Sequence, residues 1–382
     1  MNTPQPPDSQ TEAPAAPVVV AWASAAREAA FLDWIGALAG EHQLVLSTLR
    51  PASADASFRR YLRLDREGGA GSVIVMDAPP EHENCRPFVE VSRLMQKAGL
   101  RVPHILDWHE QRGFMLLEDV GDQTLLEVLS PERPADALPY YRDATSSLLA
   151  WQGASRPGVL PPYDEALLTR ELELFPEWYL GRHKGLEIDA KTREMLSATF
   201  RTLVQRNLAA PQVFVHRDFM PRNLMLPRGP YPVARQTGAP QTHLAVLDFQ
   251  DAVYGPITYD MASLMRDAFL TWEEDFVLDV TIRYWEQARR LGLMDFEGWS
   301  EDFGAFYRAV EWMGLQRHLK VAGIFARLTL RDGKPKYLAD APRFIHYIRH
   351  TAVRYREFKP LLRLIDEVEG LQAASGFAYG RV

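Results

Sequence analysis

Apolar residues recur at two different spacings along the chain, and this change divides it into two parts. One face of a predicted helix carries Phe31, Trp34, Ile35 and Leu38, and Gly40 is its predicted end. Short runs rich in apolar and β-branched residues follow, and they predict strands at 44–49, 58–64, 72–76, 104–108 and 113–117. An amphipathic helix is predicted between them, over 88–98. Residues 42–117 therefore predict a small sheet with one long helix.

Beyond Asp119 helical spacing dominates. Helices are predicted over 137–153, 164–182, 189–208, 258–271, 274–291, 299–322 and 341–372. A strand-rich stretch over 213–253 interrupts them, and its Pro, Gly and Gln residues at 227–242 predict an exposed loop. The pattern predicts an α+β fold of two lobes, with a β-rich N-lobe over 21–118 and a helical C-lobe over 119–382. Residues 1–20, rich in Pro, Gln and Ala, are predicted to be a disordered tail.

Composition excludes several classes of protein. The 382 residues carry 43 basic and 50 acidic side chains, a net charge of −7, which argues against a nucleic-acid partner. No apolar run is long enough for a membrane span. The lone Cys85 excludes an intrachain disulfide and favours a reducing cytoplasm. The apolar segment 13–26 lacks a preceding Lys or Arg and contains Pro14 and Pro17, so a signal peptide is disfavoured.

Two motifs carry the chemistry. The segment 213–226 contains His216-Arg217-Asp218 and then Asn223, which is the spacing H-R-D-x-x-x-x-N of a kinase catalytic loop. Further along, an apolar run ends in Asp248-Phe249, as in the metal-binding D-F-G of kinases, with Gln250 at the glycine position. Each motif alone is short, but their order and spacing together favour a kinase fold.

These residue types suit phosphoryl transfer from ATP. The reaction needs in-line positioning and neutralisation of phosphate charge more than covalent help from the protein. Asn223 and Asp248 offer hard oxygen ligands for Mg²⁺. Asp218 is placed to accept the proton of the attacking hydroxyl. His216 is interpreted as structural, holding the backbone of the loop rather than transferring protons.

The two motifs resemble the aminoglycoside phosphotransferase-like family of small-molecule kinases over about residues 25–370. That family usually has H-G-D-x-x-x-x-N, then D-F or D-W, then a D-x-A helix, for which Asp260-Met261-Ala262 is the match here. The resemblance implies that Asp260 is structural and braces the catalytic loop. A closer resemblance is to the bacterial anomeric kinases of N-acetylmuramate and N-acetylglucosamine in cell-wall recycling. Its strings lie at 54–61, 75–80, 117–122, 174–180 and 316–320.

Two cations expected of a kinase are missing. Met76 stands where the third strand usually carries lysine, and Met220 stands two residues after the catalytic Asp, where protein kinases often have Lys. Either the protein is an inactive pseudokinase, or the positive charge has moved. We expect Arg59 to contact phosphate, with Arg60 and Arg222 as alternatives, since arginine binds phosphate oxygens bidentately. A solvated face of arginines is the competing interpretation.

The rest of the nucleotide site is predicted from two segments. The loop over 51–57 lacks glycine, but its small residues permit close backbone approach to phosphate, and Ser53 and Ser57 add hydroxyl donors. The segment 117–120 is the predicted hinge. There the backbone at Glu118 and Val120, rather than any side chain, is expected to read the adenine.

The acceptor site is predicted on two helices. Glu171 shares a helical face with Leu167, Leu174 and Trp178. Glu171 is expected either to bind a sugar hydroxyl while Trp178 stacks on the ring, or to pair with Arg170 or Arg182. Arg317, His318 and Lys320 form a second polar group suited to an anionic lactyl substituent, although Lys320 also fits a solvated helix face.

This mixture of charges favours a neutral or anionic sugar as the small-molecule partner. A polycationic aminoglycoside would instead require a strongly acidic site, and a choline or homoserine kinase is a more distant alternative. The resemblance also implies that a nucleotidyltransferase acts next on a sugar 1-phosphate.

Overall fold

The computed structural model describes residues 20–53, 59–228 and 243–371. The chain forms two compact units: unit 1 comprises residues 1–85 and 104–119, and unit 2 comprises 86–103 and 120–382. Apart from Val20, the predicted tail lies outside the described residues, as do Ser57 and nearly all of the predicted loop at 227–242. The two units are described in turn.

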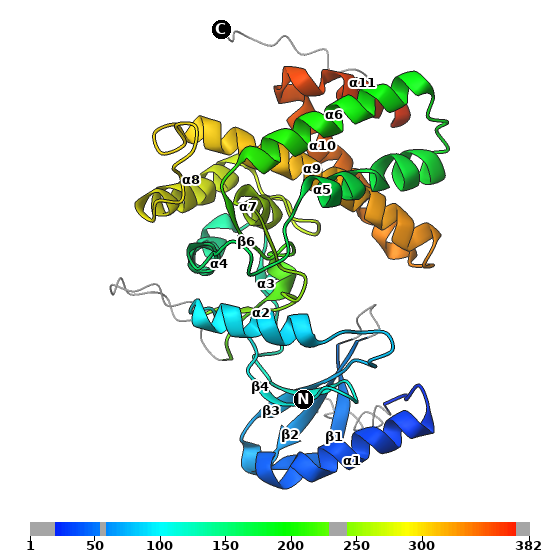
Figure 1. Ribbon diagram of the computed structural model, residues 1–382, viewed down its shortest axis with the longest axis vertical. Helices are drawn as coiled ribbons and strands as arrows, with labels where there is room; N and C mark the ends of the chain where they lie inside the picture. The colour runs from blue at the N-terminus through cyan, green and yellow to red at the C-terminus, as the bar shows by residue number, and fades with distance from the viewer. Residues whose placement is uncertain (1–19, 54–58, 229–242, 372–382) are drawn as a thin grey trace, which may run out of the picture. The chain divides into compact units, whose positions relative to one another are not determined.

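Unit 1 is an antiparallel sheet with one helix. Its elements are α1 Ala25–His42, β1 Leu44–Ser53, β2 Arg60–Arg66, the 3-10 turn η1 Glu67–Gly69, β3 Ser72–Asp77, β4 Ile105–His109 and β5 Phe114–Glu118. The five strands lie in the order β1-β2-β3-β5-β4. All five strands predicted for this part of the chain are confirmed. Figure 1 shows α1 running along one face of the sheet.

The core of unit 1 forms because α1 and the sheet bury complementary apolar faces. Phe31, Trp34 and Ile35 of α1 are buried against alternate residues of β2 and β3, which follow the period of two expected of a strand. Trp34 stacks on Phe114 of β5 with ring centroids 5.2 Å apart. The helix ends at His42 rather than Gly40. The next residue, Gln43, adopts the left-handed conformation and donates its N–H to carbonyls of the last turn.

Unit 2 is largely helical. Its helices are α2 Arg86–Lys97, α3 Leu125–Val128, α4 Pro134–Gly153, α5 Glu165–Leu172, the π-helix η2 Phe175–His183, α6 Ala190–Ala209, α7 Thr258–Met265, α8 Glu274–Arg290, α9 Phe303–Leu330, α10 Ala341–Arg354 and α11 Lys359–Val368. The 3-10 turns are η3 Pro221–Asn223, η4 Pro335–Asp340 and η5 Arg356–Phe358. β6 Gln212–Val215 pairs with β9 Val253–Pro256, and β7 Leu224–Met225 pairs with β8 Ala245–Val246.

The predicted helix over 164–182 is not a single α-helix. It divides into α5 and the π-helix η2, so the expected common face of Glu171 and Trp178 is wrong. Pro176 lies in the first turn of η2, where it removes a backbone donor. Opposite the break, a Cβ on Gly323 of α9 would lie 2.4 Å from the carbonyl carbon of Leu174. The bulged turn therefore packs directly on the backbone of α9.

The partition of the chain differs from the expected one around α2, which groups with unit 2 rather than with the sheet. The reason is its apolar face: Phe88 contacts Phe249, the residue after the predicted metal ligand, with ring centroids 4.7 Å apart. The predicted helix over 341–372 is also broken after Arg354 by η5, and the helix predicted over 258–271 ends at Met265.

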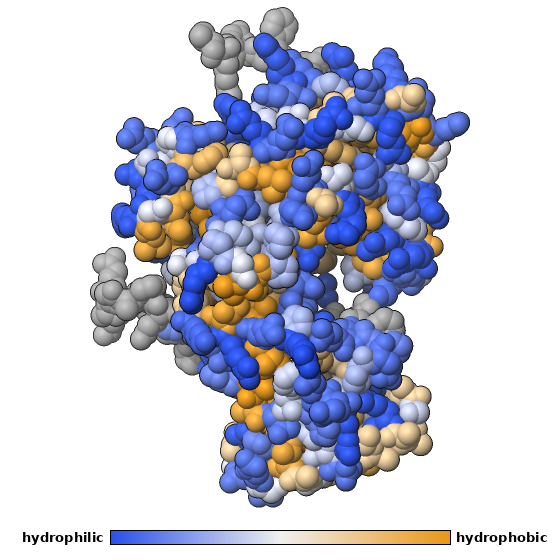
Figure 2. All heavy atoms as spheres, viewed as in Figure 1, coloured by the Kyte–Doolittle hydropathy of each residue, from blue (hydrophilic) through white to orange (hydrophobic). Residues whose placement is uncertain are grey.

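Figure 2 shows that hydrophilic residues cover most of the visible face, with apolar residues gathered in smaller groups between them. Within the described ranges, every helix is too short or too polar to cross a membrane.

Candidate active site

The predicted catalytic loop is positioned by two small strand pairs in unit 2. β6 leads into His216, and β7 follows Asn223. The side-chain amide of Asn223 donates to the backbone oxygen of Asp218 at 2.9 Å, which closes the loop on itself. The backbone N–H of Leu247 donates to the oxygen of Asn223 at 2.9 Å. This bond joins the loop to the segment that ends in Asp248.

Asp260 on α7 fixes the start of the loop. Its buried carboxylate accepts hydrogen bonds from the backbone N–H groups of His216, at 2.7 Å, and Arg217, at 3.0 Å. Arg217 has a φ of 79°, in the left-handed region that disfavours a side chain. Burial raises the pKa of Asp260 to about 7, against the lowering effect of these two bonds. The geometry is that of a brace, the role implied for Asp260 by the family resemblance.

His216 uses both ring nitrogens inside the protein. Nε2 lies 3.0 Å from the oxygen of Leu247, and Nδ1 accepts the backbone N–H of Asp218 at 3.2 Å. These partners require a neutral ring protonated at Nε2. Burial lowers the pKa of His216 and favours that neutral form. The ring therefore holds backbone groups on both sides and has no nitrogen available for a substrate.

Asp248 also has a left-handed backbone, with a φ of 61°. One of its carboxylate oxygens accepts a hydrogen bond from the Gln250 amide at 2.8 Å, and no described residue bonds the other. Removal of water by surrounding atoms raises the pKa of Asp248; Gln250 opposes the shift and the nearby Asp218 adds to it. Asp218 and Asp248 are thus close enough for their charges to interact.

The donor set fits a magnesium ion that retains other ligands. Nowhere in the described ranges do three His, Cys, Asp or Glu side chains gather as a metal site. Asn223 and Asp248 would supply two oxygen ligands, as predicted, and Mg²⁺ usually keeps waters and substrate phosphate oxygens in its remaining positions. The carboxylates of Asp218 and Asp248 repel each other, and a cation bound near them and near the amide of Asn223 would offset that repulsion.

Glu171 belongs to a buried charged network beside the catalytic loop. Its Oε1 lies 2.7 Å from Nη2 of Arg217 and 2.9 Å from Nζ of Lys320, and its Oε2 accepts the hydroxyl of Tyr163. Burial alone would raise the pKa of Glu171, but Lys320 and Arg217 outweigh it and the pKa is lowered. Glu171 is therefore an anion whose two oxygens are engaged by protein groups.

This network corrects two expectations. Glu171 is paired, but with Arg217 and Lys320 rather than with Arg170 or Arg182. The alternative that Lys320 lies on a solvated helix face is wrong, since Lys320 is only 8% exposed and also donates to the hydroxyl of Tyr259 at 3.1 Å. The sequence could not show this because α9 is buried along most of its length, on every side.

The other predicted acceptor residues lie in different surroundings. Trp178 is buried on η2, and the guanidinium of Arg182 covers its ring at 4.4 Å from the centroid. His318 is buried on α9, where Nε2 lies 3.1 Å from the oxygen of Arg266. Burial lowers the pKa of His318 to about 3, so it is neutral and unsuited to binding an anion. Arg317 is buried as well, next to Met220 of the catalytic loop.

The predicted phosphate-binding arginines of unit 1 both contact acids. Nε of Arg59 lies 3.0 Å from Glu83. Arg60 pairs with the buried Asp77, with Nε at 3.1 Å, and lies over the ring of Trp22. Asp77 also binds Arg27 at 2.6 Å. Arg60 is thus part of a packed ion cluster at the start of α1.

In the predicted hinge, residues 117–120, the contacts are made by backbone groups, by the carboxylate of Asp119 and by the apolar side chain of Val120. The N–H of Glu118 donates to the oxygen of His104 at 2.8 Å within unit 1. Asp119 is bound by Ser72 at 2.5 Å and by Arg63 at 2.8 Å, so its carboxylate has a structural role. In unit 2, Val120 packs with Met225 and Ala245, and Leu247 joins the same small cluster. Ser53 ends β1, in register with Tyr61.

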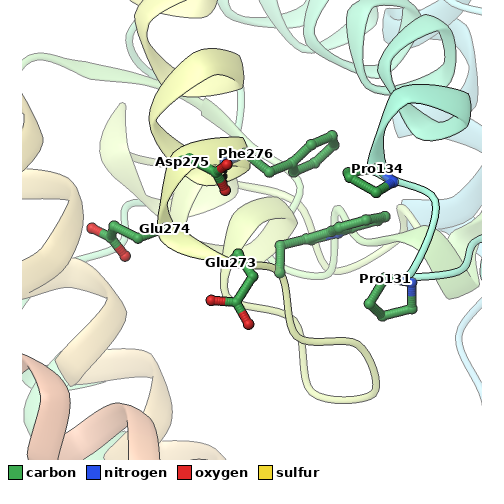
Figure 3. A pocket seen from close by; sticks show the side chains of 7 residues that line it. Pro131, Pro134, Glu273, Glu274, Asp275 and Phe276 are labelled. Carbon is green, nitrogen blue, oxygen red and sulfur yellow. Dashed lines mark hydrogen bonds between the residues drawn. The ribbon is translucent and has the colours of Figure 1, made fainter.

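A pocket of about 360 Å³ lies elsewhere in unit 2. Figure 3 shows the side chains that line it. It is lined by Pro131, Pro134, Trp272, Glu273, Glu274, Asp275 and Phe276. None of the residues predicted for catalysis, metal or substrate is among them. Two of its lining residues bond other parts of unit 2. Trp272 donates to Tyr141 at 2.7 Å, and Glu274 pairs with Arg266 at 2.7 Å.

Several residues of this region were missed by the sequence analysis. Gln250 positions Asp248, Tyr163 and Tyr259 complete the network of Glu171, and Asp267 lies directly after α7. Only the spacing of seven residues between Asp260 and Asp267 could have drawn attention to Asp267, since two turns of a helix bring such residues to one face.

A sheet-containing unit, a helical unit and this catalytic loop define the chain as a kinase-like phosphotransferase. The chain belongs to the phosphotransferase enzyme family, whose model matches residues 48–296. It is 46% identical over 330 residues to the N-acetylmuramate/N-acetylglucosamine kinase of Neisseria meningitidis, covering 86% of this chain and 93% of that one. It is 48% identical over 326 residues to the enzyme of that name in Pseudomonas aeruginosa, covering 85% and 90%.

Solved structures share the fold at low sequence identity. The choline kinase LicA of Streptococcus pneumoniae has a TM-score of 0.56 and 11% identity, and the match covers 85% of this chain and 99% of that one. A putative aminoglycoside phosphotransferase of Ralstonia eutropha has a TM-score of 0.55 and 14% identity, covering 88% and 98%. The expected two-lobed, protein-kinase-like fold is thereby confirmed.

Proposed function

We propose that this protein transfers the γ-phosphoryl group of ATP to the anomeric hydroxyl of N-acetylmuramate or N-acetylglucosamine, giving a sugar 1-phosphate. The observation that carries the proposal is the identity of 46% and 48% to two kinases named for these sugars, over 86% and 85% of the chain. Matches of this length include the catalytic loop, the metal ligands and the helices of the predicted acceptor site.

Asp218 is the proposed base. It accepts the proton of the sugar hydroxyl, or aligns it, as the hydroxyl oxygen bonds to the γ-phosphorus and the bond to the β-phosphate oxygen breaks. An anomeric hydroxyl is more acidic than an ordinary alcohol, so a carboxylate suffices to activate it. Asn223 and Asp248 would hold Mg²⁺, which when bound offsets the charge of the phosphate oxygens. His216 and Asp260 keep the loop in place through backbone bonds.

For the nucleotide, Arg59 is the proposed phosphate contact. Its ion pair with Glu83 has the charge composition of the kinase Lys–Glu pair, in which the cation binds phosphate while the acid holds it. Arg60 is a weaker candidate because Asp77 and Trp22 already fix its guanidinium. The cluster of Val120, Met225 and Ala245 supplies an apolar surface suited to a planar base.

The charges near the loop favour a neutral or anionic acceptor over a polycationic one. Arg217 and Lys320 pair with Glu171, and Arg317 lies next to Met220 of the loop, so a polycationic aminoglycoside would meet three cations. The fold similarity to aminoglycoside phosphotransferases, at 14% identity, carries no argument about substrate. A catalytically inactive protein is disfavoured because Asp218, Asn223 and Asp248 are all present.

The proposal places the enzyme in the cytoplasm, where ATP is available and the thiol of Cys85 remains reduced. Its product is chemically suited to a nucleotidyltransferase that forms a UDP-sugar, as in peptidoglycan recycling.

One assay panel tests the function. Purified protein with ATP and Mg²⁺ is given each of the two sugars, their 1-deoxy analogues and a kanamycin-type aminoglycoside, and phosphorus NMR locates the new phosphate. We expect turnover of at least one sugar and none of its 1-deoxy analogue. Equal rates with parent and 1-deoxy sugar would place the chemistry at another hydroxyl. Efficient turnover of the aminoglycoside alone would contradict the assignment.

A further inference from the structure

Arg317 on α9 is a buried charge without an adequate partner. It is 2% exposed, and its Nη1 has no hydrogen-bond partner among the described residues. Its Nη2 contacts the sulfur of Met220 at 3.8 Å, and a thioether is a weak acceptor. Burying a guanidinium is costly unless oxygen acceptors satisfy it. The position therefore calls for an acceptor that the described part of the chain does not provide.

Asp267 is the complementary case. It follows α7, is 0% exposed, and bonds the backbone N–H of Ala268 through Oδ1 at 2.6 Å. Its Oδ2 has no partner among the described residues. Burial raises the pKa of Asp267 to about 6, and the charge of Arg317 opposes this shift most strongly. The two side chains therefore act on each other electrostatically, although no ion pair within the described ranges joins them.

Arg317 lies beside the catalytic loop, and Asp267 lies within range of the Arg317 charge. Met220, which touches Arg317, is two residues beyond the predicted base Asp218. Arg317 also acts on the pKa of Asp260, the brace of the catalytic loop. In addition, α7, which ends just before Asp267, packs directly on α9, which carries Arg317. An unsatisfied donor, Nη1 of Arg317, thus borders the loop that must receive the phosphoryl acceptor, and its charge acts on Asp267, which carries an unsatisfied acceptor.

We propose that Arg317 and Asp267 together bind one non-reacting hydroxyl of the acceptor sugar. Nη1 of Arg317 donates a hydrogen bond to the hydroxyl oxygen, and Oδ2 of Asp267 accepts a hydrogen bond from the hydroxyl O–H. This inference rests on the proposed sugar kinase function. A hydroxyl is both donor and acceptor, so one group satisfies both orphaned atoms. The unbranched Met220 side chain has the torsional freedom to move aside and expose Arg317.

The presence of Asp267 changes the expected ligand of Arg317. A lactyl carboxylate would satisfy Arg317 but would leave Asp267 facing a second negative charge without a proton to accept. The 4- and 6-hydroxyls are free in both N-acetylmuramate and N-acetylglucosamine, so a hydroxyl contact serves both sugars. Arg317 and Asp267 therefore recognise what the two substrates share.

The test compares N-acetylglucosamine with its 4-deoxy and 6-deoxy analogues in wild type, Arg317→Met and Asp267→Asn. We expect wild type to lose about 10- to 100-fold in kcat/KM with one deoxy analogue, because a lost hydroxyl leaves buried polar groups unpaired. In each variant that loss should shrink to about twofold or less, with the KM for ATP changed by no more than about twofold.

Arg343→Met is the matched control, since Arg343 contacts the same loop through the oxygen of Ala268 at 3.2 Å. It should keep the wild-type preference between parent and deoxy sugars. Unchanged preferences in both Arg317→Met and Asp267→Asn, in folded and active enzymes, would overturn the inference. So would an equal loss for all three sugars accompanied by a lower Tm, which indicates a structural water between the two groups. Failure of wild type to phosphorylate either sugar would instead contradict the proposed function.

Discussion

Asp260 accepts a hydrogen bond at 3.0 Å from the backbone N–H of Arg217, the residue that precedes the predicted base. A carboxylate on one helix thereby fixes a backbone conformation in the catalytic loop that a side chain disfavours. The resemblance places glycine at this position in most of the family, and glycine adopts such a conformation without steric cost. Here Arg217 adopts it, with its N–H held by Asp260.

The first prediction concerns the catalytic group. Asp218→Asn should lower kcat by about 10²–10⁴, the usual effect of removing a general base, while ATP binding stays nearly unchanged. Asp248→Asn should instead weaken the response to Mg²⁺, because it removes one of the two predicted protein ligands. Steady-state kinetics and nucleotide titration across a Mg²⁺ series separate the two variants. An Asp218→Asn enzyme with wild-type kcat would exclude Asp218 as the base.

The second prediction concerns phosphate binding. Arg59→Ala should lower kcat/KM for ATP by about tenfold or more, equivalent to about 1.4 kcal/mol, because the proposed phosphate cation is lost. Glu83→Gln should have a smaller effect in the same direction, since it releases Arg59 without removing its charge. Met76→Ala is the control and should affect stability more than kinetics, because Met76 is buried. Wild-type kinetics in both Arg59→Ala and Arg60→Ala would leave Arg222 as the candidate.

The third prediction concerns the network of Glu171. Glu171→Gln leaves Lys320 and Arg217 buried beside each other without their anion and should destabilise the fold by about 3–5 kcal/mol. Urea unfolding measures the change. A loss below about 1 kcal/mol would show that the pairs are no stronger than exposed ones.

The third prediction extends to the backbone of Arg217, a member of the same network, which a pair of substitutions isolates. Arg217→Ala and Arg217→Gly remove the same ion pair, but only glycine tolerates a φ of 79° without strain. We expect the glycine variant to be more stable than the alanine variant by about 1–2 kcal/mol. Equal stability of the two in urea unfolding would mean that the loop relaxes when the side chain is lost.

The fourth prediction concerns the packing of η2 on α9. Gly323→Ala places a Cβ at 2.4 Å from the backbone of Leu174, a contact that requires the two elements to separate. Overpacking of this kind typically costs about 1–3 kcal/mol. Gly40→Ala is a suitable control, because a Cβ there meets nothing within 4 Å. A Tm for Gly323→Ala equal to that of the control would contradict the close approach.

The fifth prediction concerns pH. Burial opposes ionisation of Glu274, but Tyr307 and Arg266 outweigh it and lower the pKa to about 2. A lowered pKa contributes stability that is complete above the unfolded value of 4.5 and is lost as the pH falls towards 2. The stability difference between wild type and Glu274→Gln should therefore be constant from pH 7 to 5 and shrink below it. A difference independent of pH down to 3 would exclude this linkage.

The fold could be predicted from the sequence where local pattern decides it. β2 and β3 alternate visibly, and their strands match the expected runs within two residues. The pattern failed at η2, where the turn at Leu174 packs on the backbone of Gly323, a residue of another helix. Nothing local reveals such a contact.

The catalytic motifs could be predicted because their residues lie close together in the sequence at a fixed spacing. The partners of Glu171 could not, since Arg217 and Lys320 come from the catalytic loop and α9, 46 and 149 positions away. Pairing of buried charges depends on tertiary contacts, and sequence proximity favoured Arg170 and Arg182 instead. His318 was misjudged for the same reason, because a run of charged and polar residues on a long helix does not show which of them are buried.

The assignment of α2 to unit 2 has a consequence for how the protein can be divided. The chain passes between the units after residues 85, 103 and 119, so unit 1 is discontinuous. Cleavage by a protease after Asp119 alone would give the fragments 1–119 and 120–382, and the first fragment would keep α2, a part of unit 2. Expressing residues 1–119 would likewise carry α2 along without Phe249, its aromatic partner in unit 2. The architecture is therefore two units in space but not two separable segments of chain.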